Sequence, residues 1–353
     1  MNMGRTMMDE RFDWLRFALN PSLPQPKISD WRALFEFVKV QCIFGICNPT
    51  RYNVKIDTDI LLAWMSRTIP LKVVNTLINK RTVSLAKELN GAGFRCCILK
   101  GQGNAAMYPE PEIRCPGDID VWVDADQKEI YEYVRKRFPD AAETYKHIYF
   151  PLFDDVKVDL HHFPLTFRYP PRQKRLQKWI EKNKNEQFSH PIRLNGTDSD
   201  IYVPTVKFNA VYQLGHIMIH LCDGGIGLKQ LVDYYYVLKH VSDLSQRERE
   251  EICLTWKQLG MYRLATAVMW IEAEELGLSE DLLLVKPHEK RGRLLLEDIL
   301  EGGSFGHYSQ RRIIRRKGFL RYGLITTKRL VWLASYIPGE VIFKIINKIR
   351  QDV

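Results

Sequence analysis

Apolar side chains recur at helical spacing over most of the chain, on both sides of a shorter middle region. Before position 90 the apolar residues lie three or four positions apart, which places them on one face of a helix. The same spacing returns after Pro204, with a break at Pro338. Pro70 is suited to begin a helix, because the first turn leaves unpaired the N–H that proline lacks. The pattern predicts helices over residues 5–20, 30–44, 59–67, 70–89, 206–222, 227–241, 245–258, 261–276, 289–300 and 318–350.

The middle region contains shorter apolar runs that predict strands. Residues 94–99 form a largely apolar run, and residues 118–123 alternate acidic and apolar side chains. A helix is expected over 125–138, followed by two strands over 145–150 and 156–160. The order of these elements predicts a small mixed sheet with helices packed against it. We therefore expect an α+β protein.

The change of pattern along the chain divides it into three expected parts. Residues 1–69 are expected to form a predominantly helical N-terminal segment. Residues 70–203 carry the strands and are expected to form the α+β core, and residues 204–353 a helical C-terminal domain with a basic tail.

Two carboxylates occupy alternate positions of the strand expected over 118–123. Side chains alternate between the two faces of a strand, so Asp118 and Asp120 share one face. In the strand that follows later, Asp159 and His161 also share a face, and Asp159 can reach the first two acids if the strands are neighbours. Clustered carboxylates are typical ligands of Mg²⁺ or Mn²⁺. The alternative is a solvated edge strand with surface acids.

A glycine turn precedes the carboxylates and adds two basic candidates. Lys100 and Arg114 are suited to neutralise phosphate charge, one as a point charge and the other as a bidentate fork. Gly101 and Gly103 would let the backbone approach a ligand closely. For each basic residue the alternative is an ion pair with a nearby acid.

These motifs resemble those of the polymerase-β-like nucleotidyltransferase superfamily. More narrowly, the chain is similar to an uncharacterised bacterial branch with a Leu-Lys-Gly turn, an arginine before Gly-Asp-Ile-Asp and a later Val-Asp-Leu-His. Here these motifs are residues 99–101, Arg114, residues 117–120 and residues 158–161. The resemblance is specific over residues 70–165. The chain departs from most of the superfamily in having Lys-Gly where a Gly-Ser turn usually holds the nucleotide phosphates.

The resemblance implies a metal-dependent transfer of a nucleotidyl group from a nucleoside triphosphate to a hydroxyl or phosphate acceptor. It implies Mg²⁺ or Mn²⁺ on Asp118, Asp120 and Asp159, with Asp159 as a metal ligand or as acceptor of the proton of the attacking hydroxyl. Lys100, Gly101, Gly103, Arg114 and His161 are the expected substrate-side residues. A rival interpretation is a non-catalytic binding module on the same fold.

Four further residues in the helical part are open to two interpretations. His216 and His220 are four positions apart on one helix face, but no Glu lies between them as a zinc protease would require. We interpret them as core or supporting residues. Lys229 and Asp233 either face the site or lie on the helix surface.

The cysteines and the N-terminus indicate where the protein works. The seven cysteines include no Cys-x-x-Cys pair, so we expect reduced thiols and no structural zinc. The first residues are charged and lack the apolar core of a signal peptide, and no apolar run approaches ~18 residues. We expect a cytoplasmic protein, with the inner membrane surface as an alternative place of contact.

Positive charge is concentrated at the C-terminal end. The chain has a net charge of +10, and residues 311–353 contribute eleven lysines and arginines against two acids. Basic and apolar residues alternate there, which suits a helix docked on the domain, a membrane surface or a protein partner. The basic residues also suit nucleic-acid phosphates, which are the less favoured partner.

Overall fold

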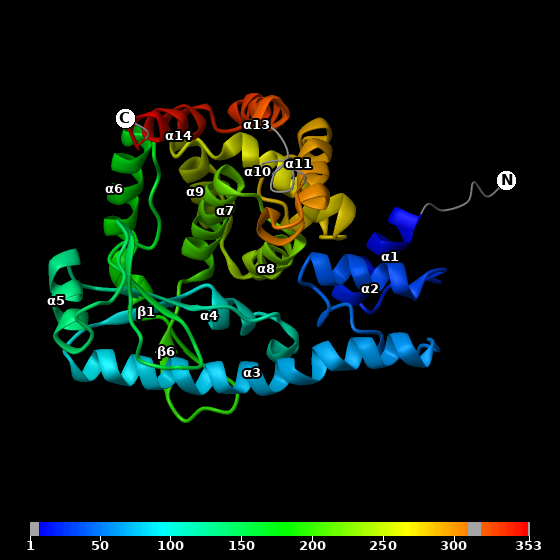
Figure 1. Cartoon of the computed structure of the whole chain (residues 1–353), viewed down its shortest axis with the longest axis horizontal. Coiled ribbons are helices and arrows are strands. Elements are labelled where there is room, and N and C mark those ends of the chain that lie inside the picture. The colour runs from blue at the N-terminus through cyan, green and yellow to red at the C-terminus, as the bar shows by residue number, and fades with distance from the viewer. Residues whose placement is uncertain (1–6, 310–318, 352–353) are drawn as a thin grey trace.

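The computed structural model describes residues 7–309 and 319–351, and Figure 1 shows how their elements are arranged. The long helix α3 (Thr58–Gly91) runs along one side of the molecule. The strands lie above it, and the helices of the C-terminal half cover the opposite side. Helix α2 (Trp31–Val40) packs beside the first half of α3, and α1 (Met7–Leu19) packs against α2.

Helix α3 corrects the prediction of two separate helices over 59–67 and 70–89. It is a single helix of 34 residues with Pro70 inside it. Proline at position 70 leaves the carbonyl of Ser66 without its helical N–H partner, but Ser66 and Pro70 are both exposed, so water can bind that carbonyl. Trp64 and Leu71 are buried on the other face and hold the two halves in line. The expected boundary at 69/70 therefore lies within a continuous helix.

Four strands form the predicted mixed sheet in the order β1-β2-β4-β3. Strand β2 is antiparallel to β1 and parallel to β4, and β3 is antiparallel to β4. Helix α4 (Gly101–Ala105) follows β1, and α5 (Gln127–Arg137) follows β2. A hairpin of β5 (Pro191–Arg193) and β6 (Asp200–Tyr202) forms a second small sheet. The strands of the main sheet are β1 (Cys96–Leu99), β2 (Ile119–Val123), β3 (His147–Tyr149) and β4 (Val158–His161).

The two faces of the main sheet belong to different hydrophobic cores. Ile119 and Val121 pack with residues of α3 and α5, as the alternation in β2 predicted. Trp122 lies on the other face, in the core of the helical part. There it contacts Phe208, with ring centroids 5.9 Å apart. Asp118 and Asp120 lie on the same face of the chain as Trp122, because the three residues are two positions apart. The carboxylate face of β2 is therefore turned toward the helical part.

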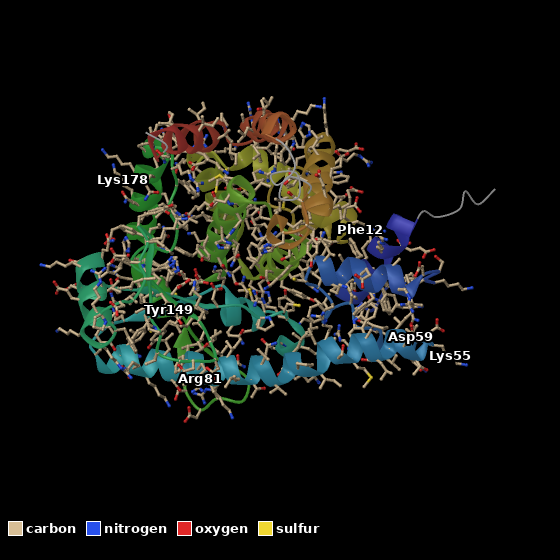
Figure 2. The ribbon with its side chains drawn as sticks, viewed as in Figure 1. Phe12, Lys55, Asp59, Arg81, Tyr149 and Lys178 are labelled. Carbon is tan, nitrogen blue, oxygen red and sulfur yellow. The ribbon has the colours of Figure 1, made fainter. Side chains whose placement is uncertain are left out.

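An ion pair ties the end of the sheet to α3. Arg81 on α3 donates to Asp155 in the turn before β4 (2.8 Å), and its guanidinium lies over the ring of Phe153. Figure 2 labels Arg81 on the long helix.

The remaining described residues are mostly helical, as predicted. Prolines interrupt residues 163–203, and the basic stretch 172–184, which the sequence makes a helix candidate, lies within α6. The described helices are α6 (Pro170–Gln187), α7 (Val206–Asp223), α8 (Leu228–Lys239), α9 (Gln246–Gln258), α10 (Tyr262–Trp270), α11 (Glu289–Gly302), α13 (Phe319–Ala334) and α14 (Pro338–Gln351). The α+β class is thereby confirmed. Over the described ranges, every helix is too short or too polar to cross a bilayer.

Part of the basic tail docks on the domain. The carboxylate of Glu340 in α14 is buried and accepts the backbone N–H groups of Arg168 and Tyr169 (2.7 and 3.2 Å). Lys344 donates to the carbonyl of Cys222. The basic cluster over residues 311–317 lies outside the described residues. Contact of this tail with a membrane surface or a partner stays a prediction.

Candidate active site

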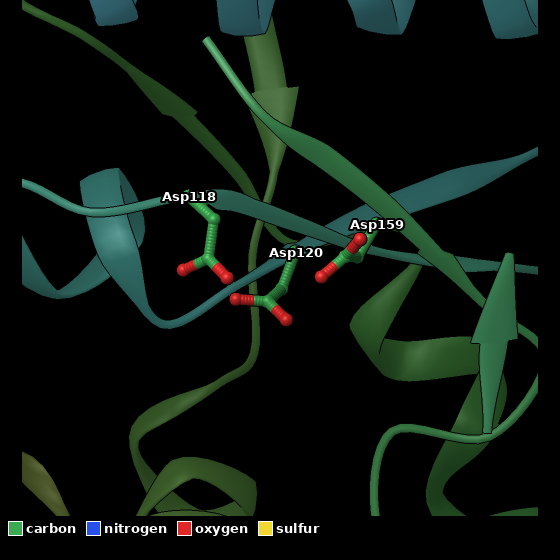
Figure 3. Close-up of side chains that lie close together, drawn as sticks. All are labelled: Asp118, Asp120 and Asp159. Atoms are coloured by element: carbon green, nitrogen blue, oxygen red, sulfur yellow. The ribbon is translucent and has the colours of Figure 1, made fainter. Parts of the chain in front are cut away.

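The three predicted carboxylates lie together on one face of the sheet. Asp120 in β2 is paired in register with Asp159 in the parallel strand β4, and Asp118 immediately precedes β2. One oxygen of each carboxylate lies within 4.8 Å of the others, and Figure 3 shows the three side chains converging. Asp118 is exposed, whereas Asp120 and Asp159 are buried. The expected neighbourhood of the two strands is confirmed.

Lys100 contributes a positive charge to the same cluster. Its Nζ lies 2.8 Å from Oδ2 of Asp120 and 3.2 Å from Nε2 of His216. The backbone at Lys100 has φ +38° and ψ −140°, a conformation that residues other than glycine rarely adopt. Such strain costs on the order of 1–3 kcal/mol and is found mainly at functional sites. The turn between β1 and α4 therefore holds Lys100 against the carboxylates.

His161 lies next to the carboxylates, as its position in β4 predicted. Its Nε2 is 2.9 Å from Oδ1 of Asp120. On the other side its ring contacts His147 in β3, with centroids 4.9 Å apart. Lys157 donates to Oδ2 of Asp159 (2.8 Å), and Nε2 of His147 lies 3.7 Å from the same oxygen.

Lys157 and His147 were not among the residues predicted from the sequence. Lys157 could have been predicted from the two-residue period of a strand, because residue 157, just before β4, shares a face with Asp159. His147 is opposite His161 in the antiparallel pair of β3 and β4, and that register becomes evident only in the folded sheet.

The basic neighbours keep the buried carboxylate of Asp120 ionised. Burial alone would raise the pKa of Asp120, but Lys100 and His161 outweigh burial and hold that pKa well below its ordinary value. Burial would also lower the pKa of Lys100, yet Asp120 and Asp118 raise it. The pair is therefore a carboxylate and an ammonium at neutral pH. The pKa of His147 is lowered, first by burial and then by His161.

The two histidines of α7 support Lys100. Nε2 of His216 faces Lys100, and Nε2 of His220 lies 2.9 Å from Nε2 of His216. Burial and Lys100 lower the pKa of His216 well below its usual range, and the same causes lower the pKa of His220 to about 4. Both rings are therefore neutral at pH 7, which agrees with the interpretation as supporting residues.

One comparison with known proteins assigns the chain to a family. The family model described as uncharacterised nucleotidyltransferase matches residues 28–274, a range that contains every residue named above for the site. The chain belongs to this nucleotidyltransferase family. No curated protein sequence matches the chain. Among solved structures, an antigenic nucleotidyltransferase-like protein from Paracoccidioides brasiliensis is similar, with 12% identity and a TM-score of 0.30, over 53% of this chain and 88% of that one.

In this chain, Arg114 is engaged in a buried ion pair. Its Nε and Nη2 donate to the two carboxylate oxygens of Asp233 in α8 (2.7 and 2.8 Å), and the hydroxyl of Tyr108 donates to Oδ1 of Asp233 (2.6 Å). This arrangement is the ion pair with a nearby acid that was the alternative to phosphate binding. Nε and Nη2 of the Arg114 guanidinium are already bonded to Asp233. Asp233 is buried rather than at the helix surface, and Lys229 approaches the carbonyl of Pro116 (3.4 Å).

Gly101 and Gly103 allow close packing around the turn. Gly101 has φ +48°, and a Cβ there would lie 3.5 Å from the carbonyl oxygen of Asp118. A Cβ at Gly103 would lie 3.2 Å from Cγ1 of Val203 and 3.4 Å from the carbonyl oxygen of Ile98. Gly101 therefore allows the Lys100 turn to lie close to the start of β2, and Gly103 allows α4 to pack against β1 and Val203.

The carboxylates fit a divalent metal ion. Oδ1 of Asp159 is buried without a hydrogen-bond partner, which is costly unless a cation or a proton occupies its lone pairs. Oxygen ligands from three carboxylates suit hard cations such as Mg²⁺ and Mn²⁺. A metal site built from protein side chains needs several His, Cys, Asp or Glu ligands close together. Within residues 7–309 and 319–351, the group that meets this condition is Asp118, Asp120 and Asp159.

Proposed function

We propose that the protein is a Mg²⁺- or Mn²⁺-dependent nucleotidyltransferase that uses a nucleoside triphosphate and modifies a hydroxyl or phosphate acceptor. The observation that carries the proposal is the convergence of Asp118, Asp120 and Asp159, two of them buried, beside the ammonium of Lys100. Metal ions held by these carboxylates would offset the negative charge of the triphosphate and of the leaving pyrophosphate.

The side chains around the cluster suit the remaining tasks of the reaction. The ammonium groups of Lys100 and Lys157 contact Asp120 and Asp159, respectively, and are suited to bind phosphate oxygens. The unpartnered Oδ1 of Asp159 is suited to accept the proton of the acceptor hydroxyl. The deprotonated oxygen of the acceptor would then form a bond to the α-phosphorus, while the bond from that phosphorus to the bridging oxygen of the β-phosphate breaks and pyrophosphate leaves. His161 fixes the orientation of Asp120.

Calorimetric titration tests the proposal directly. We would titrate ATP, GTP, CTP and UTP with Mg²⁺ into the wild type and into Asp118→Ala/Asp120→Ala. Asp154→Ala is the matched control, because Asp154 is an exposed acid in the turn between β3 and β4. We expect metal-dependent binding of at least one nucleotide by the wild type and the control, and its loss in the double variant. Equal binding by all three proteins would contradict the proposal.

The rival function is a non-catalytic binding module on the same fold. The observation that favours it is that both buried carboxylates already contact an ammonium group, at 2.8 Å in each case. Absence of nucleotide binding by the wild type, with Mg²⁺ and with Mn²⁺, would support this function. The basic C-terminal tail would then be the surface to test for a membrane or protein partner.

A further inference from the structure

Lys100 places a positive charge next to the carboxylates that would bind a metal ion. Its Nζ is 2.8 Å from Oδ2 of Asp120, and it also interacts electrostatically with Asp118 and Asp159. Only 22% of the side chain is exposed, so water screens these interactions weakly. A divalent cation bound to Asp120 must therefore displace this ammonium or bind against its repulsion.

The structure offers the ammonium a second partner. Nε2 of His216 lies 3.2 Å from Nζ of Lys100, on the side provided by α7. The ring of His216 is half-buried and neutral, so its nitrogen can accept a hydrogen bond from the ammonium. If Asp120 binds another cation, Lys100 keeps this neutral partner and remains inside the site. Its charge is then available to a phosphate group.

We propose that Lys100 is a tethered counter-ion, that is, a positive charge held in the site by the chain itself. Its ammonium competes with a divalent cation for Asp120 and pairs with the phosphates of the nucleotide when the nucleotide binds. The metal alone then binds weakly, because two cations share one carboxylate. The triphosphate relieves this competition, since its oxygens attract both the ammonium and the metal. Metal and nucleotide each increase the affinity of the other, as reciprocal coupling requires. The nucleotide half of this inference rests on the proposed function, whereas the competition between Lys100 and the metal does not.

Lys157 is a natural comparison for Lys100. Its Nζ also lies 2.8 Å from a carboxylate oxygen of the cluster, Oδ2 of Asp159. However, 54% of the Lys157 side chain is exposed, against 22% for Lys100. Solvent therefore screens its charge more strongly, and Lys157 should compete less with a metal.

The experiment measures Mn²⁺ affinity by titration calorimetry on the full chain without nucleotide. The proteins are wild type, Lys100→Met and Lys157→Met, each checked for folding by circular dichroism. We expect Lys100→Met to bind Mn²⁺ about tenfold more tightly or better, and Lys157→Met to gain clearly less. Nucleotide affinity is then measured at saturating Mn²⁺, where we expect Lys100→Met to bind about tenfold more weakly. Opposite changes for metal and nucleotide are the signature of a tethered counter-ion.

Other outcomes overturn the inference. Unchanged Mn²⁺ affinity in Lys100→Met would show that Lys100 does not compete with the metal. Weaker binding of both ligands would indicate a structural role, and an equal gain in Lys157→Met would indicate a general charge effect. If the wild type binds no measurable Mn²⁺, gain of binding by Lys100→Met supports the inference and its absence overturns it. If the wild type binds Mn²⁺ but no nucleotide, the proposed function fails, while the Mn²⁺ comparison still decides the role of Lys100.

Discussion

Replacement of Arg114 by methionine is expected to destabilise the protein strongly. The side chains of Arg114 and Asp233 are only 6% and 9% exposed, and two hydrogen bonds of 2.7 and 2.8 Å join them. Tyr108 adds a third hydrogen bond to Asp233. Removal of one partner of such a pair leaves the other charge buried and costs about 3–5 kcal/mol. With a urea m-value of about 3 kcal/mol/M, the midpoint of unfolding should fall by about 1–2 M.

Urea titrations of four proteins measure this effect: wild type, Arg114→Met, Asp233→Leu and the double variant. The double variant should lose less than the sum of the single losses, because it leaves no unpaired charge. Asp233 has a lowered pKa, since Arg114 outweighs the effect of burial. The stability that the pair contributes is therefore complete above about pH 4 and is lost as the pH falls through the folded-state pKa. The gap between wild type and Arg114→Met should shrink in acid.

The same variants distinguish the two roles considered for Arg114. If the pair is structural, the folded double variant should bind nucleotide within about threefold of the wild type. If Arg114 contacted phosphate instead, Arg114→Met would keep its urea midpoint and lose nucleotide binding. That result would refute our reading of the buried ion pair.

Four further predictions concern the candidate metal site, the backbone and pH. Asp118→Asn should weaken Mn²⁺ binding by about tenfold or more in a calorimetric titration, yet cost less than about 1 kcal/mol of stability, because Asp118 is exposed. Gly306→Ala should cost more than about 2 kcal/mol in urea unfolding, since φ is +65° and a Cβ would lie 2.2 Å from the carbonyl oxygen of Gly224. Gly91→Ala, with nothing within 4 Å of the added Cβ, should stabilise by roughly 0.5–1 kcal/mol. His220, with its pKa lowered to about 4, should reduce stability by on the order of 2 kcal/mol between pH 7 and 5, and His220→Gln should reduce the pH dependence of stability, measured by urea unfolding, by that amount.

The carboxylate cluster was predictable because it depends on local alternation. The two-residue period of a strand puts Asp118 and Asp120 on one face and Ile119 on the other, whatever the rest of the chain does. One further assumption, that the strand containing Asp159 is a neighbour, completed the group, and the parallel pairing of β2 and β4 bears it out. The mixed sheet and the α+β class followed from the same pattern.

The partners of the basic residues were not predictable, because they come from distant parts of the chain. Lys100 meets His216, 116 positions later, and Arg114 meets Asp233, 119 positions later. Nothing in the spacing of either residue indicates which acid or ring it will face. The continuation of α3 through Pro70 had a similar cause, since the cost of a proline depends on whether the freed carbonyl is exposed, and exposure is set by tertiary packing.

The position of the site between two hydrophobic cores explains why its parts are so distant in sequence. One face of the sheet packs on α3 and α5, and the other, which carries Asp120 and Trp122, is covered by α7. A carboxylate on that second face is shielded from water only because the helical part lies over it. The same helical part supplies His216, which flanks Lys100. The charge balance of the carboxylates is therefore a property of the assembled chain, and the segments 70–203 and 204–353 contribute to it together.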